Sequence, residues 1–335
     1  MDKRLQALRS WIDTVLGISV HDLRLASTDA SFRRYFRIVV GAQTYIAMDA
    51  PVDKYDPQRY TLLATRLAEL GLNVPKVLAQ NVDRGFFLLT DLGERLYLSQ
   101  LNDDTAEHLY GDARAALVVL QAGIYSDSGF LADYDEQLLM TEMELFREWY
   151  LGRHLGVRLA PHQNKVLDGT FEQLTRLALA QPKVWVHRDY HSRNLMVTEQ
   201  NNPGILDFQD AVRGPVTYDL VSLLRDCYIT WPRTRVEGWV RGYHTLALQS
   251  GLPVCEGGEQ FLHWFDLMGV QRHLKAVGIF ARLKHRDGKP GYLGDIPRTL
   301  GYVLDVSARC AALQPLYQLL CELKLPEATG DEERA

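Results

Sequence analysis

The sequence has few of the features that mark secreted, membrane or nucleic-acid-binding proteins. Its four cysteines are scattered over 335 residues and form no C-x-x-C pair, which argues against a disulfide framework or a zinc site. No apolar run is long enough to cross a bilayer. The net charge of −5 gives no basic field that would attract nucleic acid or anionic lipid. We therefore expect a cytoplasmic protein with neither a nucleic acid nor a membrane as its partner, and the oligomeric state stays open.

The first part of the chain is rich in short β-prone runs. Its opening residues, MDKRLQALRSWIDTVLG, have no apolar core of a signal peptide and predict an amphipathic helix instead. The runs LRLAS, SFRRYFRIVV and TYIAMDA then precede a helix that is expected to begin near Pro57 and to end near Gly71. Two further runs, KVLAQ and FFLLT, follow. The order β-β-β-α-β-β is the layout of a kinase amino-terminal lobe.

From about Leu101 the pattern becomes helical. Candidate helices cover residues 105–121, 138–154 and 164–179, and helical patterns resume from about Tyr218 to Leu323. We predict an α+β, two-lobed, protein-kinase-like fold. Its small β-rich amino-terminal lobe spans residues 1–93, its larger helical lobe spans 94–325, and 326–335 form a frayed tail.

The strongest chemical signal is the segment VWVHRDYHSRNLMV, which is followed by GILDFQD. An apolar strand leads into a polar loop with Asp189 and Asn194, and a short return run pairs with a strand that ends at Asp207. Phosphoryl transfer needs such a set, with one carboxylate as base and hard oxygen ligands for magnesium. The spacing matches the kinase catalytic loop H-R-D-x-x-x-x-N, and Asp207-Phe208 stands at the place of D-F-G. We predict Asp189 as the catalytic base and Asn194 and Asp207 as the metal ligands.

The nucleotide-binding side lacks two expected features. Residues 27–34 stand where kinases have a glycine-rich loop, yet they contain no glycine, and Ser31 is the candidate to donate to a phosphate there. On the third strand, Met48 occupies the place of the lysine that pairs with the α- and β-phosphates. Another cation must then neutralise the phosphates if the protein binds ATP.

Arginines of the preceding strand are the nearest candidates for that cation. In a strand, Arg33 and Arg37 share one face, whereas Arg34 shares the other face with Phe36 and other apolar residues that suggest a core. We predict that Arg33 or Arg34 binds phosphate, because the arginine fork suits this ligand. Solvated charges at a strand edge are the alternative.

The motif HRDYHSRNLMV…GILDFQDAVRGPVTYDLVSLLRDCY resembles the aminoglycoside phosphotransferase family, whose fold is similar to that of protein kinases. The resemblance implies ATP and magnesium as cofactors. It implies that Asp219 braces the catalytic loop and that the Thr90 carbonyl and the Leu92 N–H contact adenine. It also implies that His191 faces the transferred phosphate, although a solvent-exposed loop histidine is an equal alternative.

The acceptor side is predicted to be basic. In FLHWFDLMGVQRHLKAVGIFARLKHRDGK, an apolar helix carries Arg272, Lys275 and Arg282 on one face. These cations either line a water-filled pocket or pair with acids of neighbouring helices, and Trp264 is a candidate to stack on a sugar. A basic pocket suits a neutral or anionic acceptor better than a polycationic antibiotic.

The runs DASFRRYFRI, YIAMDAP and QRHLKAVGIFARL extend the resemblance to one branch of the family, the bacterial sugar kinases of cell-wall recycling. This resemblance implies ATP-dependent phosphorylation of the C1 hydroxyl of N-acetylmuramate and N-acetylglucosamine. Two alternatives remain. One is an aminoglycoside antibiotic phosphotransferase, and the other is a non-catalytic nucleotide-binding regulator, a pseudokinase, which Met48 and the glycine-free loop would favour.

Overall fold

The computed structural model divides the chain into two compact units. The first unit consists of Met1–Gln100 with Asn194–Gln209, and the second of Leu101–Arg193 with Asp210–Ala335. The residues described below are 2–19, 22–26, 32–53, 56–126 and 129–325. The first unit thus extends past the predicted boundary at residue 93, and it takes in a segment that the sequence assigned to the second lobe. The predicted tail, 326–335, lies outside the described residues.

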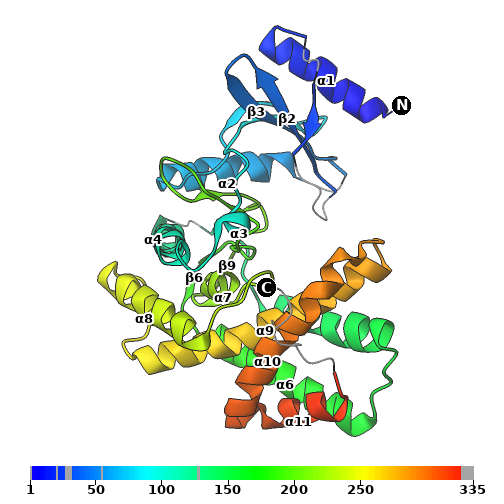
Figure 1. The fold of residues 1–335 in the computed structure, drawn as a ribbon, viewed down its shortest axis with the longest axis vertical. Coiled ribbons are helices and arrows are strands. Elements are labelled where there is room, and N and C mark those ends of the chain that lie inside the picture. Colours follow the sequence, from blue (N-terminus) through cyan, green and yellow to red (C-terminus); the bar gives the residue numbers. More distant parts are fainter. Residues whose placement is uncertain (1, 20–21, 27–31, 54–55, 127–128, 326–335) are drawn as a thin grey trace. The chain divides into compact units, whose positions relative to one another are not determined.

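The first unit is built on a five-stranded antiparallel sheet with the strand order β1-β2-β3-β5-β4. Its strands β2 and β3 are labelled in Figure 1. Its elements are α1 (Lys3–Leu16), β1 (Arg24–Leu25), β2 (Arg34–Val40), β3 (Gln43–Asp49), α2 (Pro57–Glu69), β4 (Val77–Asn81), β5 (Phe86–Thr90), α3 (Tyr97–Gln100), β7 (Leu195–Met196) and β8 (Gly204–Ile205). The predicted order of three strands, one helix and two strands is therefore confirmed.

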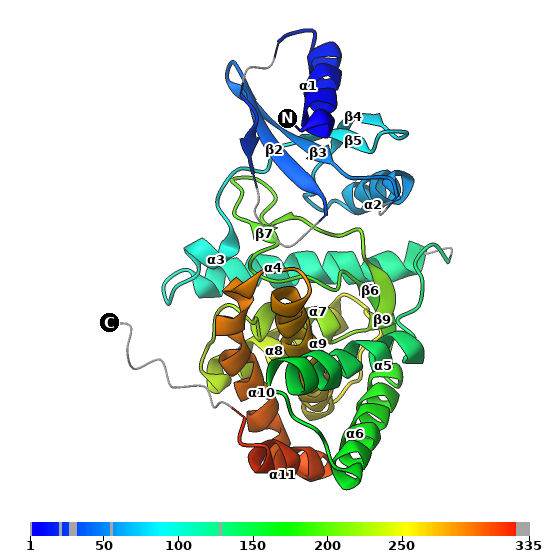
Figure 2. The same cartoon turned by 90° about the vertical axis from the view of Figure 1, so that its right-hand side faces the viewer.

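Helix α1 covers one face of this sheet (Figure 2). Its buried residues Leu8 and Ile12 share a core cluster with Phe36, Ile38 and Ala47 of the sheet. The Asp2 side chain caps the helix by accepting from the N–H groups of its first turn, and Gly17 ends it in the left-handed conformation. The amphipathic helix predicted from the first residues is thus present, and its apolar stripe packs against the sheet.

Helix α2 packs on the opposite face. Phe86 contacts Trp11 of α1, whereas the next residue of β5, Phe87, contacts Tyr60 of α2. Successive side chains of a strand point to opposite faces, so the two helices cover the two sides of the sheet. The Asp56 side chain caps α2, and Pro57 occupies its first turn, where no N–H is needed.

The antiparallel pair β7–β8 belongs to the first unit despite its late position in the chain. Gly204 forms a parallel bridge with Asn73, and Met196 forms an antiparallel bridge with Leu96. A Cβ on Gly204 would lie 2.9 Å from the end of the Leu92 side chain, so a larger residue there would have to displace this side chain. These long-range pairings explain why a boundary read from local sequence patterns misses this segment.

The second unit is mainly helical. Its elements are α4 (Ala106–Ala122), η1 (Gly123–Ser126), α5 (Glu136–Leu145), η2 (Phe146–His154), α6 (Pro161–Leu179), β6 (Lys183–Val186), β9 (Val212–Pro215), α7 (Tyr218–Leu224), α8 (Arg233–Gln249), α9 (Gly258–His285), η3 (Pro290–Asp295), α10 (Ile296–Arg309), η4 (Ala311–Leu313) and α11 (Gln314–Glu322). Strands β6 and β9 form a two-stranded antiparallel sheet. Together the two units confirm the predicted α+β class.

Helix α9 is the central element of the second unit and contacts α5, α6, α7, α8 and α10. It is buried over most of its length, as its nearly all-apolar first part predicts. The single helix predicted over 138–154 is instead two segments, because α5 gives way at Phe146 to the π-helical turns of η2. In the part of the chain that the structure describes, no helix combines the length and apolar character that a membrane span requires.

Replacing Gly278 with Ala is expected to destabilise the second unit. An ideal Cβ at this position of α9 would lie 2.3 Å from the backbone carbonyl carbon of Leu145, and backbone atoms cannot yield as a flexible side chain can. Such overpacking should lower the free energy of unfolding by about 2 kcal/mol or more. Urea denaturation measures it.

Gly169→Ala in α6 is the matched control for this substitution. A Cβ there would meet no atom within 4 Å, so alanine should raise the stability by about 0.5–1 kcal/mol. Equal effects of the two substitutions would contradict the close packing of α9 on α5.

Candidate active site

The loop that follows β6 carries the predicted base and is held by a buried carboxylate. Asp219, at the start of α7, accepts hydrogen bonds from the backbone N–H groups of His187 (2.6 Å) and Arg188 (3.0 Å). These bonds hold Arg188 at a φ of 77°, a conformation that a non-glycine residue keeps only when its surroundings impose it. The brace predicted for Asp219 is therefore present. Burial raises the pKa of this carboxyl to about 6.

Asp189 lies one residue further along this loop and is half-buried. Burial opposes its ionisation, but the positive charges of Lys275 and Arg188 outweigh this effect and lower its pKa. Asp189 is therefore an anion at neutral pH. An ionised carboxylate is the state that a general base requires.

Asp226 holds the second half of the loop. Its carboxylate accepts from the backbone N–H of Ser192 at 2.9 Å, from the Ser192 hydroxyl at 2.5 Å and from the Tyr228 N–H at 3.1 Å. The His191 ring meets the Tyr228 ring edge-on, with 5.4 Å between centroids. Burial lowers the pKa of His191, so this imidazole is neutral at pH 7 and can act there only as a hydrogen-bonding group. Within the described part of the chain, its Nδ1 has no hydrogen-bond partner.

The two predicted metal ligands lie at the same end of the β7–β8 pair in the first unit. Asn194 directly precedes β7, and its carbonyl accepts from the N–H of Leu206, the residue before Asp207 (2.9 Å). Asp207 has a φ of 61°, again a left-handed conformation at a non-glycine residue. Its Oδ1 accepts from Gln209 at 2.9 Å and from Arg33 at 2.6 Å.

This donor set suits magnesium better than a transition metal. Among the described residues, no cluster of three or more His, Cys, Asp and Glu side chains could enclose a metal ion. Magnesium commonly takes one or two carboxylates and completes its shell with water and substrate phosphates. One carboxylate and one carboxamide at Asp207 and Asn194 therefore fit an ion that arrives with a nucleotide.

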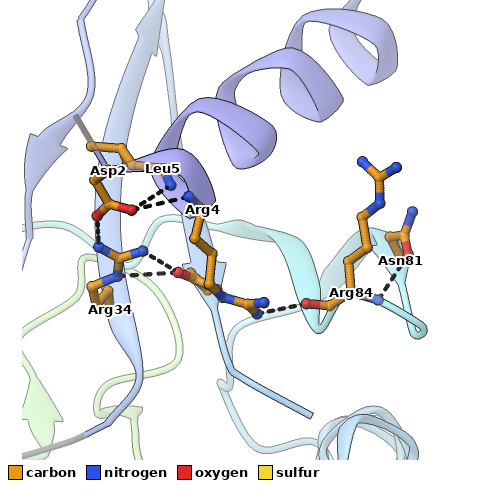
Figure 3. A network of polar contacts seen from close by, with 7 residues as sticks. Asp2, Arg4, Leu5, Arg34, Asn81 and Arg84 are labelled. Atoms are coloured by element: carbon orange, nitrogen blue, oxygen red, sulfur yellow. Dashed lines mark hydrogen bonds and ion pairs between the residues drawn. The ribbon is translucent and has the colours of Figure 1, made fainter.

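The Arg34 side chain interacts with acidic residues of the first unit (Figure 3). It forms ion pairs with Asp2 and with the fully buried Asp49, at 2.5 Å for the latter, and Arg4 of α1 also pairs with Asp49 at 2.6 Å. These contacts lie on the α1 face of the sheet, as the alternation of Arg34 with Phe36 and Ile38 predicts. They give the phosphate role predicted for Arg34 no support, because they join α1 to the sheet.

Arg37 is in β2 and Arg33 directly precedes this strand, and each has a carboxylate partner. Arg37 binds Asp91 through two hydrogen bonds and also contacts Glu94, so it fixes the segment after β5. Arg33 is 8% exposed and contacts Asp207, a predicted metal ligand. Of the three arginines, Arg33 is thus the one that lies at the predicted metal site. The Ser31 candidate falls outside the described residues.

The predicted adenine contacts lie on an ordered segment. The N–H of Thr90 donates to the Lys76 carbonyl at 3.0 Å, and its hydroxyl accepts from the Lys76 N–H at 2.9 Å. Leu92 is half-buried, and the Asp91 carboxylate accepts from the Gly93 N–H at 2.9 Å. Met48, at the place of the missing lysine, is fully buried in β3.

The cations predicted for the acceptor side differ in their partners. Lys275 forms an ion pair with Glu142 at 3.0 Å and donates to the Tyr218 hydroxyl at 2.9 Å. Of the two predicted alternatives, Lys275 therefore pairs with an acid of a neighbouring helix. Arg272 is 5% exposed and contacts the Cys227 sulfur at 3.6 Å. No carboxylate of the described residues lies within ion-pairing distance of Arg272, and its Nε has no partner there. An unpaired buried guanidinium is costly, which favours a ligand-binding role.

Trp264 precedes Arg272 in α9, and Arg282 follows it. Arg282 is half-buried, and burial together with Arg286 lowers its pKa. Trp264 is half-buried eight residues before Arg272, which corresponds to about 12 Å along the helix at 1.5 Å per residue. The structure therefore does not bring Trp264 close to Arg272.

Sequence analysis missed Glu142. This carboxylate of α5 is 5% exposed and accepts from Arg188, which directly precedes the predicted base, at 2.5 Å. Its signal in the sequence is an acid within the mainly apolar stretch QLLMTEMELF, where a buried charge requires partners.

Comparisons with known proteins identify the family of this chain. Residues 22–257 match the family described as the phosphotransferase enzyme family. The chain is 46% identical to an N-acetylmuramate/N-acetylglucosamine kinase of Pseudomonas putida, over 96% of this chain and 97% of that protein. It is 44% identical to a protein of the same name from Neisseria meningitidis, over 97% and 96% of the two chains.

Solved structures agree on the fold. The choline kinase LicA from Streptococcus pneumoniae is similar with a TM-score of 0.65 at 14% identity, over 90% of this chain and 99% of that chain. An aminoglycoside 2'-phosphotransferase in complex with GDP gives a TM-score of 0.62 at 15% identity, over 92% and 99% of the chains. The protein belongs to the phosphotransferase enzyme family and has its kinase-like fold.

Proposed function

We propose that this protein is an ATP- and magnesium-dependent kinase that phosphorylates the C1 hydroxyl of N-acetylmuramate and N-acetylglucosamine. The observation that carries the proposal is the 46% identity to a kinase named for these two sugars, over nearly the full length of both chains. The ionised, braced Asp189 loop supports a catalyst rather than a non-catalytic regulator. A cytoplasmic location belongs to the proposal, because the cytoplasm supplies ATP and keeps free thiols reduced.

Asp189 is the proposed general base. An anomeric hydroxyl is more acidic than an ordinary alcohol, so a carboxylate is basic enough to take its proton as the phosphoryl group is transferred. The neutral His191, two residues further along the loop, has an Nδ1 that can hydrogen-bond to the transferred phosphate.

Asn194 and Asp207 are the proposed magnesium ligands. Asn194 is only five residues after Asp189, so the chain itself tethers the base to the metal site. Bound MgATP would supply the phosphoryl group, and its magnesium ion would supply positive charge that balances the phosphates. Arg33 is the proposed substitute for the missing lysine, since it is buried beside Asp207 and its fork suits phosphate. The backbone of Thr90 and Leu92 is proposed to contact adenine, with Ser31 as a further phosphate donor.

Arg272 is the proposed acceptor-binding cation. Its charge has no carboxylate partner among the described residues, whereas Lys275 and the nearby Arg225 each have one. The carboxylate of N-acetylmuramate would satisfy this guanidinium. Arg282 and Trp264 remain proposed contacts for parts of an acceptor that lie away from Arg272. Lys275 is proposed to act through its charge on Asp189.

Turnover by the purified protein with MgATP tests this function. N-acetylmuramate, N-acetylglucosamine, glucose and kanamycin are compared as acceptors by ATP consumption. We expect turnover with the two N-acetyl sugars, and we expect Arg272→Met to lower kcat/KM about tenfold or more for N-acetylmuramate and less for N-acetylglucosamine. Turnover with kanamycin alone would instead favour an antibiotic phosphotransferase.

A further inference from the structure

Glu142 lies at the centre of a buried polar cluster beneath the catalytic loop. Its Oε1 contacts Arg188 Nη2 at 2.5 Å and Lys275 Nζ at 3.0 Å. Its Oε2 accepts from the Tyr134 hydroxyl and, at 3.5 Å, from the Gln271 amide. One carboxylate from α5 therefore holds two cations, one from the catalytic loop and one from α9.

Both cations also act on the predicted base. Arg188 directly precedes Asp189 in the chain, and the charge of Lys275 lowers the pKa of the Asp189 carboxyl. The guanidinium of Arg188 lies over the Tyr134 ring at 5.6 Å, and the Lys275 ammonium lies over the Tyr218 ring at 5.5 Å. Aromatic rings offer a cation much less than a carboxylate does. Glu142 pairs with both cations, and Asp189 is the other carboxylate whose charge acts on both of them.

We propose that Glu142 is a positioning residue that acts as the counter-ion of Arg188 and Lys275 and so keeps both cations from pairing with the catalytic carboxylate of Asp189. Without Glu142, two buried charges would lose their partner, and Asp189 is the carboxylate to which they would turn. A base that is held in an ion pair is less basic and is drawn from the position in which it receives the hydroxyl proton. The backbone bonds of Asp219 to the loop do not replace this effect, since they leave the side chains of Arg188 and Lys275 free to move.

The proposal rests on the proposed function in taking Asp189 as the base. The test compares Glu142→Gln, Lys275→Met and the double variant by kcat, by KM for ATP and by thermal unfolding, with the acceptor that the wild type uses best. Glu142→Gln should lower kcat about a hundredfold and leave KM for ATP nearly unchanged. The double variant should recover about tenfold of that loss. It removes one anion and one cation together, so the net charge of the cluster next to Asp189 returns to its original value.

Two variants complete the design. Glu144→Gln is the matched control, because it is on the same helix but pairs with Arg147, away from the loop, and it should leave kcat unchanged. Glu142→Asp keeps the charge and should retain more activity than Glu142→Gln, which covers the case in which the amide variant does not fold.

A merely structural role predicts a different pattern. It predicts a lower unfolding temperature with unchanged kcat, or a double variant that is no more active than Glu142→Gln, and either result overturns the proposal. A wild type that turns over none of the acceptors overturns the proposed function instead. Even then, thermal unfolding still tests the counter-ion role, because Glu142→Gln must be less stable than the double variant if Glu142 neutralises Lys275.

Discussion

Asp189→Asn is expected to lower kcat by a factor between about 100 and 10,000, the usual contribution of a positioned general base. Asparagine has nearly the same shape as aspartate, but it cannot accept the proton of the acceptor hydroxyl. The braces of the loop come from Asp219 and Asp226 and remain in place, so the affinity for MgADP should not change. Steady-state kinetics and calorimetric titration with MgADP measure the two quantities.

The control for this substitution is Asp104→Asn, which changes an exposed carboxylate of the second unit outside the catalytic loop. Its kcat should equal that of the wild type. If Asp189→Asn kept more than a tenth of the activity, another group would have to be the base. If it lost MgADP binding as well, Asp189 would belong to the nucleotide site rather than to the acceptor side.

Asp207→Asn should reduce kcat at saturating ATP by about a hundredfold or more, because it removes the one carboxylate of the proposed magnesium site. The loss should be smallest at high magnesium concentration, where mass action offsets weaker binding. A second readout does not depend on turnover. The affinity for ADP should depend on magnesium in the wild type and much less in the variant.

The Arg33→Met variant distinguishes the role of Arg33 from that of Asp207, its ion-pair partner. If Arg33 replaces the missing lysine, this variant should raise KM for ATP while its magnesium dependence stays close to that of the wild type. Exposed Arg66, which pairs with Glu69 on α2, offers a matched control as Arg66→Met. An Asp207→Asn variant with normal magnesium dependence would contradict the assignment of this carboxylate to the metal.

Local sequence patterns were sufficient to predict most of the architecture. The order of three strands, one helix and two strands along the chain and the start of α2 at Pro57 depend on neighbouring residues, and both are confirmed. The spacing of the catalytic loop matches a kinase motif, and the brace from Asp219 was implied by the resemblance to the aminoglycoside phosphotransferase family. The break between α5 and η2 was not predictable, because it depends on a π-helical geometry that the apolar periodicity does not reveal.

Long-range pairing was the part that the sequence could not supply. Arg34 meets Asp49 across a strand pair, and Lys275 meets Glu142 from a helix more than a hundred residues away. A sequence shows that a buried cation needs a partner, but not which acid provides it. For the same reason, the sequence could not distinguish between Arg272, Lys275 and Arg282. The structure shows that Lys275 pairs with a carboxylate and that Arg272 does not.

The most direct test of the account compares N-acetylglucosamine with its methyl glycoside, in which the C1 hydroxyl is blocked. Both are offered to the purified protein with MgATP, and the products are examined by phosphorus NMR. The account predicts a C1 phosphate from the free sugar and no product from the glycoside. Phosphorylation of the methyl glycoside at a rate similar to that of the free sugar would contradict it, because another hydroxyl would then be the acceptor.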